Sequence, residues 1–227
     1  MEPVMHKDIL PEKTMMVLSR LAKTLKKYDA ILAGGTGLAL HLGHRVSVDL
    51  DFFTGKEFRV ESLVSDIRKT ALPFQVIRDE EDTLIAFVGG IKTALFRYEY
   101  PFLEKTGQLE GIRVAGVLDI ASMKVIAISQ RGTKRDFADL YFILNEIPFP
   151  RIASHMVSRF GPERLSPVHT GKSLVYFTDA ESEPDPEYME GKDPGWEKVK
   201  TFFKDHVKQL VLDLDSAIKA WGSGPAS

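Results

Sequence analysis

The segment "LAGGTGLALHLGHRVSVDLDFF", residues 32–53, contains the two features that are most informative about the fold. Gly34 and Gly35 stand between a short apolar strand and a run of residues with helical character. Asp49 and Asp51 are separated by one residue, inside an otherwise apolar segment that is typical of a buried strand. Charge at such a position is costly unless something neutralises it.

The aspartate pair has a geometric consequence. Residues i and i+2 of a strand point to the same face, so Asp49 and Asp51 project together while Leu50 points into the core. Two carboxylates about 5 Å apart repel by roughly 3 kcal/mol at an effective dielectric of 20. A hard divalent cation, Mg²⁺ or Mn²⁺, would offset that repulsion through its preference for oxygen ligands. The alternative is a strand end with two solvated acids, and the spacing alone does not choose between them.

The glycine-containing turn before the helix favours a ligand-binding site over two solvated acids. Gly34-Gly35-Thr36 follows a strand and opens a helix, so backbone N–H groups and a hydroxyl lie at the positive end of that helix. Such an end is suited to a triphosphate. The alternative is a tight turn in which Thr36 is an ordinary N-cap. Because the intervening residues are mostly helix, the second strand can return alongside the first and bring Asp49 near the turn.

The rest of the chain predicts an α/β (α+β) protein with a mixed sheet and a mainly helical C-terminal part. Gly89-Gly90 is a two-residue hairpin signal between two strands. Helices are expected over 11–28, 36–44, 59–72, 117–130, 133–146, 151–160 and 196–221, and strands over 30–34, 47–53, 74–78, 84–88, 91–100 and 173–177. The expected parts are a core over 1–112, a helical part over 113–221 that closes a cleft, and a disordered tail over 222–227.

Composition limits the classes of function. The chain has 227 residues with 44% hydrophobic and 27% charged residues, ordinary values for a globular protein. A net charge of −2 gives no sign of a general polyanion binder. The absence of cysteine excludes disulfides, thiolate metal sites and cysteine nucleophiles. The first residues lack a signal-peptide pattern and no apolar run of 18 residues occurs, so we expect a cytoplasmic protein without a membrane segment.

Two motifs resemble a known superfamily. "GGT" followed by "DLD" resembles the G-[GS]-[ST]-x(n)-D-x-D signature of polymerase-β-type nucleotidyltransferases. The block "LDIASMKVIAISQRGTKRDFADLYFIL" (118–144) is similar to the lysine-arginine-"RDFxDLY" block of the AbiEii/AbiGii toxin family. Together the resemblance spans about residues 30–145. It implies a nucleotidyltransferase fold in which Gly34, Gly35 and Thr36 bind the triphosphate and Asp49 and Asp51 hold the metal.

The resemblance also assigns residues of the second block. It implies that Lys124 steadies the charge of the nucleotide, and that Asp136 or Asp139 orients this lysine or accepts a proton. Asp136 has a structural explanation, because Thr133 to Asp136 fits a capping-box-like pattern. Asp139 is therefore favoured for catalysis. Glu99 is the candidate for a third metal-site acid, although its position near Pro101 places it at the end of a strand.

The implied reaction transfers NMP from an NTP to an acceptor hydroxyl and releases pyrophosphate. For the toxin-type relatives the acceptor is RNA, notably tRNA ends, and an antitoxin protein is the expected partner. Phosphate contacts need cations, and Lys134, Arg135, Arg151 and Arg159 are candidates for a basic track. The alternatives are transfer to a small molecule, as in antibiotic-type nucleotidyltransferases, and a nucleotide-binding interaction module without turnover.

Overall fold

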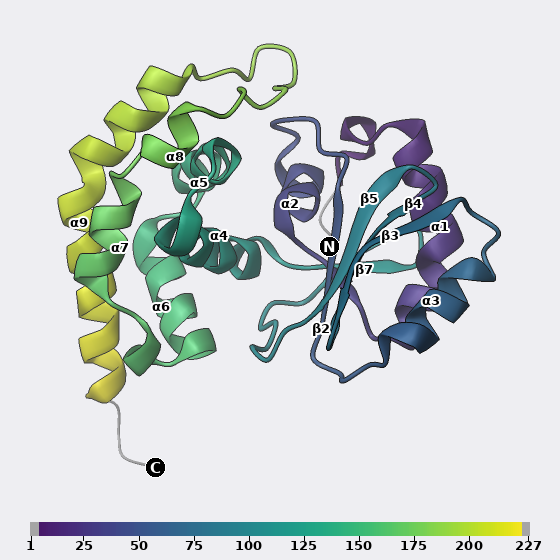
Figure 1. Cartoon of the computed structure of the whole chain (residues 1–227). Helices are drawn as coiled ribbons and strands as arrows, with labels where there is room; N and C mark the ends of the chain where they lie inside the picture. The colour runs from purple at the N-terminus through teal and green to yellow at the C-terminus, as the bar shows by residue number, and fades with distance from the viewer. Residues whose placement is uncertain (1–4, 224–227) are drawn as a thin grey trace. The chain divides into compact units, whose positions relative to one another are not determined.

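The computed structural model describes residues 5–223, and the final part of the predicted tail, 224–227, lies outside them. The chain divides into two compact units, the first ending at Gly116 and the second beginning at Val117. The expected α/β class, with a mixed sheet followed by a mainly helical part, is confirmed (Figure 1). Within residues 5–223, no helix is both long enough and apolar enough to cross a bilayer.

The first unit is built on a seven-stranded mixed sheet. Its strands are β1 (Ile31–Leu32), β2 (Leu50–Thr54), β3 (Phe74–Glu80), β4 (Thr83–Val88), β5 (Ile91–Arg97), β6 (Gly107–Leu109) and β7 (Ile112–Val114). They lie in the order β3-β4-β5-β2-β1-β7-β6. The pairs β1–β7 and β2–β5 are parallel, and the other neighbours are antiparallel. The central position of β1 and β2 places the glycine turn and the acid pair in the middle of the sheet.

Helices lie on both sides of this sheet (Figure 1). The short helix η1 (Lys7–Ile9) precedes α1 (Glu12–Lys27), which packs with α3 (Val60–Arg68) on one side. There Leu21, Leu25 and Leu63 face Phe52 and Leu84 and form the core. Helix α2 (Gly34–Leu42) lies on the opposite side, which is called the α2 side below.

Turns fix the ends of the strands. The predicted hairpin is confirmed, because Gly89 and Gly90 have φ of +58° and +76° and join β4 to β5. The short strands β6 and β7 were not predicted, and Gly111, with φ of +77°, lies in the turn between them. At the other end of the sheet, β3 is an edge strand whose register shifts between Val76 and Arg78.

The second unit is helical. Its elements are α4 (Val117–Arg131), α5 (Lys134–Glu146), α6 (Phe149–Phe160), η2 (Pro162–Arg164), α7 (Pro167–Leu174), α8 (Thr178–Glu181) and α9 (Trp196–Gly222). The strand predicted over 173–177 is wrong. Ser166 caps α7 and Pro167 occupies its first turn, so the apolar residues that follow, such as the buried Leu174, end a helix.

Candidate active site

Gly34 is required by the turn that opens α2. Its φ is +60°, and the N-cap of the helix is Ala33. A Cβ built on Gly34 would lie 3.1 Å from Oδ2 of Asp51. A side chain at this position would therefore be strained by the backbone and crowded by the carboxylate. The glycine lets the acid approach the first turn of the helix.

The acid pair lies at the start of β2. Asp51 belongs to the strand, and Asp49 directly precedes it. Leu50 between them is fully buried, whereas both acids are partly exposed. Because side chains alternate along a strand, the carboxylate of Asp51 is on the face opposite Leu50, which is the α2 side. The backbone N–H of Ala33 donates to the carbonyl of Asp51 over 3.0 Å, which fixes the strand beside the glycine turn.

Thr36 ties α2 to the segment that leads into β2. It is only 1% exposed, and its hydroxyl donates to the carbonyl oxygen of Asp49. The same hydroxyl lies 2.8 Å from Oγ of Ser47. Thr36 is therefore not the N-cap, and it holds the backbone of the acid pair. Contact of Thr36 with a triphosphate stays a prediction. Sequence reasoning missed Ser47, although a polar residue two places before Asp49 was a visible signal.

A third carboxylate does not stand beside the pair on β5. In the parallel register, Ala94 is the partner of Asp51. Glu99 is exposed, lies beyond the end of β5, and is five residues past Ala94, which is about 16 Å of extended chain. Among residues 5–223, no group of three or more acidic, histidine or cysteine side chains is arranged to hold a metal ion. The protein thus offers two carboxylates at this position.

The second unit brings Lys124 against both candidate aspartates. Its Nζ lies 2.8 Å from Oδ1 of Asp136 and 2.7 Å from Oδ2 of Asp139. The lysine comes from α4 and the two acids come from α5. The side chain of Asp139 is fully buried and that of Lys124 is 9% exposed, so this pair is shielded from solvent.

Asp136 has the capping role that the sequence predicts. Thr133 Oγ1 accepts from the backbone N–H of Asp136 over 3.1 Å, and Oδ2 of Asp136 accepts from the N–H of Thr133 over 3.2 Å. One carboxylate oxygen thus caps α5 while the other accepts from Lys124. The buried Asp139 has no such role in the cap. This difference favours Asp139 for a function that concerns the lysine.

Two of the four residues of the predicted basic track are not available at the surface. Lys134 is buried and pairs with Asp185 over 3.1 Å. Arg159 is buried, and its Nη1 donates to the carbonyl oxygen of Asp119 over 2.6 Å. Arg135 and Arg151 are exposed. The expectation of a four-residue track is therefore wrong for Lys134 and Arg159.

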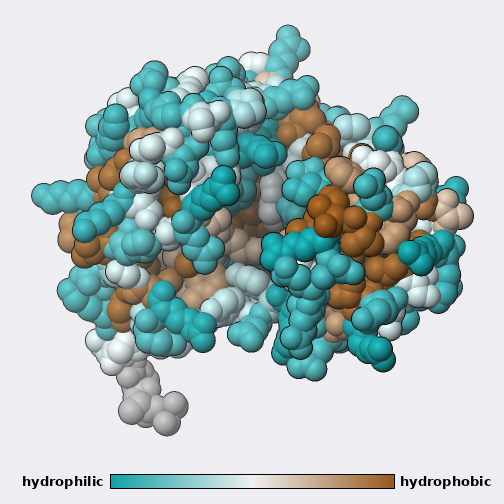
Figure 2. Space-filling view, in the orientation of Figure 1, coloured by the Kyte–Doolittle hydropathy of each residue, from teal (hydrophilic) through white to brown (hydrophobic). Residues whose placement is uncertain are grey.

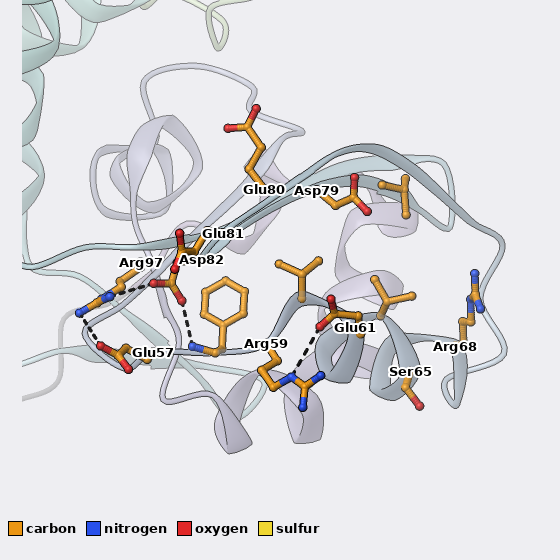
Figure 3. A pocket seen from close by; sticks show the side chains of 14 residues that line it. Glu57, Arg59, Glu61, Ser65, Arg68, Asp79, Glu80, Glu81, Asp82 and Arg97 are labelled. Carbon is orange, nitrogen blue, oxygen red and sulfur yellow. Dashed lines mark hydrogen bonds and ion pairs between the residues drawn. The ribbon is translucent and has the colours of Figure 1, made fainter.

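A groove of about 1060 Å³ lies between α3 and the β3–β4 hairpin (Figure 3). Its charged residues are Glu57, Arg59, Glu61, Arg68, Asp79, Glu80, Glu81, Asp82 and Arg97. Arg97 pairs with Asp82 over 2.9 Å and lowers the pKa of that carboxyl group. Acids outnumber bases, which disfavours phosphate groups. Because α3 lies on the opposite side of the sheet from α2, a ligand in this groove would be on the other face of the sheet from the carboxylate of Asp51.

The comparisons with known sequences identify related chains. The profile of the family described as "Nucleotidyl transferase AbiEii toxin, Type IV TA system" matches residues 17–111. The protein "Uncharacterized protein aq_aa25" of Aquifex aeolicus is 39% identical over 191 residues, which cover 81% of this chain and 88% of that protein. A match of this extent and identity shows common family membership.

Solved structures share the fold. The nucleotidyltransferase toxin MenT4 of Mycobacterium tuberculosis is 17% identical with a TM-score of 0.59, and the alignment covers 91% of each chain. JHP933 of Helicobacter pylori is 18% identical with a TM-score of 0.55, over 94% of this chain and 98% of that one. Likeness at this identity concerns the fold alone.

Proposed function

Because the chain belongs to the AbiEii family of nucleotidyltransferase toxins, we propose that it transfers NMP from an NTP to a hydroxyl group of an RNA acceptor, with Asp49 and Asp51 as metal ligands. The observation that carries the proposal is the contact geometry at Gly34. A Cβ would be tightly placed there, because Oδ2 of Asp51 lies 3.1 Å from its position. A carboxylate so close to the first turn of a helix is suited to a metal-bound triphosphate.

The two carboxylates fit a hard divalent ion. Mg²⁺ commonly takes one or two protein carboxylates and completes its coordination with substrate phosphates and water. Bound Mg²⁺ or Mn²⁺ would neutralise the charge that builds up on the phosphoryl group. The first turn of α2 would hold the triphosphate, because the free N–H groups at Gly34 and Gly35 lie at the positive end of the helix. Thr36 would keep Asp49 in position through its bond to the Asp49 carbonyl.

The reaction would be a displacement at the α-phosphorus. The acceptor hydroxyl oxygen forms the new bond to phosphorus, and the bond from phosphorus to the bridging oxygen of the β-phosphate breaks. Pyrophosphate leaves, and the proton of the hydroxyl passes to a base or to water. Lys124 would contribute positive charge to the anionic centre. Asp139, buried and 2.7 Å from the lysine, would act as a positioning residue that keeps Lys124 oriented.

The proposed acceptor and partner are those that the resemblance to the toxin-type family implies. We propose RNA, with tRNA ends as the first candidates, and a cognate antitoxin protein that restrains the activity. A small-molecule acceptor is the alternative within enzymes, and a nucleotide-binding module without turnover is the alternative outside them. The exposed Arg135 and Arg151 are the two members of the predicted basic track that remain available for RNA phosphates.

The proposal is tested by incubating the purified full chain with each α-³²P-labelled NTP, Mg²⁺ and total tRNA. We expect label in RNA with at least one nucleotide, and its loss after removal of Mg²⁺ with EDTA. Asp49→Asn should abolish incorporation. Asp79→Asn, an exposed acid on β3 of the same sheet, is the matched control and should retain it. If no label is incorporated with any of the four NTPs while NTP still binds, the nucleotidyltransferase proposal is rejected in favour of a nucleotide-binding interaction module without turnover.

A further inference from the structure

The sheet face that carries Asp51 continues across two neighbouring strands. Ala94 of β5 stands in register with Asp51, and Ile85 of β4 stands opposite Ala94. Residues in register share a face, and the face repeats every second residue along a strand. Phe96 and Phe87 therefore belong to the same α2 side as the acid.

Beside Asp51, this surface carries apolar side chains and one cation on β2, β4 and β5, and on β3 it continues with Arg78, which stands opposite Ile85 and pairs with Glu80. It is called the open sheet face here, and it comprises Phe53, Ile85, Phe87, Lys92 and Phe96. Phe87 is 41% exposed, and Ile85 is also partly accessible. Phe53 and Phe96 are partly accessible and pack together, with ring centroids 5.5 Å apart. Hydrophobic side chains gather at the surface over β3 to β5 in the space-filling view (Figure 2). Helix α2 packs against β2 and leaves Phe87, two strands away, accessible.

Lys92 is the cation of this face. It is exposed, stands opposite Phe87, and comes two residues before Ala94 on β5. In the continued parallel register it is level with Asp49, because Leu50 pairs with Thr93. Among residues 5–223, Lys92 has no ion-pair partner, so its ammonium group is available for an external anion. Aromatic side chains beside an available cation are the combination that binds single-stranded nucleic acid, through base stacking and phosphate contacts.

We propose that the open sheet face binds unpaired nucleotides of the RNA acceptor, with bases stacked on Phe87 and Phe96 and a phosphate at Lys92. This inference rests on the proposed function and names the surface that receives its acceptor. Phe87 is two strands from Asp51, about 10 Å across the sheet, so a bound strand would pass close to the acid pair. The groove beside α3 is acidic and lies on the other side of the sheet, so RNA is expected on the α2 side.

The test measures RNA binding apart from catalysis. The full chain is titrated, without NTP or metal, into a fluorescein-labelled single-stranded RNA of ten nucleotides, and fluorescence anisotropy gives Kd. Phe87→Ala should raise Kd about tenfold, which corresponds to about 1.4 kcal/mol. Lys92→Ala should lower the slope of log Kd against log salt concentration by about 0.7. Tyr176→Ala and Lys23→Ala replace an exposed aromatic residue and an exposed lysine elsewhere and should change neither quantity.

The outcomes separate this inference from the transferase activity. If both variants of the open sheet face bind the oligonucleotide as the wild type does, or if the wild type does not bind it, the surface assignment is overturned. Incorporation of label by the wild type would then still support the nucleotidyltransferase. If Phe87→Ala and Lys92→Ala weaken RNA binding but leave binding of Mg²⁺ and NTP unchanged, the assignment holds. Both substituted residues are exposed, so their variants are expected to fold.

Discussion

The substitution Gly34→Ala tests the glycine turn through two separable effects. An L-residue in the left-handed conformation costs about 1–2 kcal/mol, and Gly34 has φ of +60°. The added methyl group would also lie 3.1 Å from Oδ2 of Asp51. We expect the free energy of unfolding to fall by about 1–2 kcal/mol, which lowers Tm by roughly 2–8 °C for a chain of this size.

Gly111→Ala supplies a matched control in the same unit. Its φ is +77°, so the backbone cost is similar, but the nearest atom to an added methyl group is Cβ of Ala22 at 3.9 Å. Both variants should therefore lose comparable stability. Only Gly34→Ala should weaken binding of NTP with Mg²⁺, by at least about tenfold, because its methyl group would fill the space between the helix turn and the Asp51 carboxylate.

The assay combines thermal unfolding with calorimetric titration of each NTP in the presence of Mg²⁺, at a temperature where both variants are folded. If the two alanine variants lose similar stability and Gly34→Ala binds NTP as tightly as Gly111→Ala, the glycine turn is not the phosphate site. If Gly34→Ala loses no stability relative to the wild type, the strain argument itself is refuted.

Two further predictions concern buried or shielded charges. Asp139→Asn should lower the free energy of unfolding by about 3 kcal/mol, because it removes a buried partner of Lys124. Asp136→Asn should lower it by only about 1 kcal/mol, since the side chain of Asp136 is 15% exposed. Urea unfolding measures both values, and a larger loss in Asp136→Asn would contradict the burial argument. Burial and the Asp66 carboxylate raise the pKa of Tyr28 to about 12, so its stabilising contribution is complete below pH 10 and disappears as the pH rises through 12. A tyrosinate absorbance titration should show a late-titrating tyrosine whose pKa moves toward 10 in Asp66→Asn. An unchanged titration curve in that variant would exclude the contribution of Asp66.

Features with a local cause were predictable from the sequence. The alternation around Leu50 indicated a strand with that residue in the core, and Leu50 is fully buried in β2. The hairpin at Gly89-Gly90 and the capping box from Thr133 to Asp136 each depend on a few consecutive residues. In such patterns a few consecutive residues determine the local backbone conformation, because dihedral preferences and side-chain hydrogen bonds act over two to four positions.

Features that depend on distant partners were not predictable. Lys134 and Arg159 were expected at the surface, yet each is buried against an acceptor group 51 or 40 positions away in the chain. The bond from the hydroxyl of Thr36 to the carbonyl of Asp49 was not predicted, because the position of that carbonyl depends on how β2 returns beside β1. The error at 173–177 has another cause, because β-branched and aromatic composition imitates a strand when a helix ends in apolar residues.

The register shift in β3 has a consequence for self-association. This strand ends the sheet, so its outer N–H and C=O groups would otherwise offer a template to a strand from another molecule. The bulge around Ile77 interrupts that template, and the charged residues Arg78, Asp79 and Glu80 disfavour pairing with a strand of another molecule. Val76 and Ile77 are exposed on this strand, and we expect the bulge and the charges beside them to disfavour strand pairing between molecules.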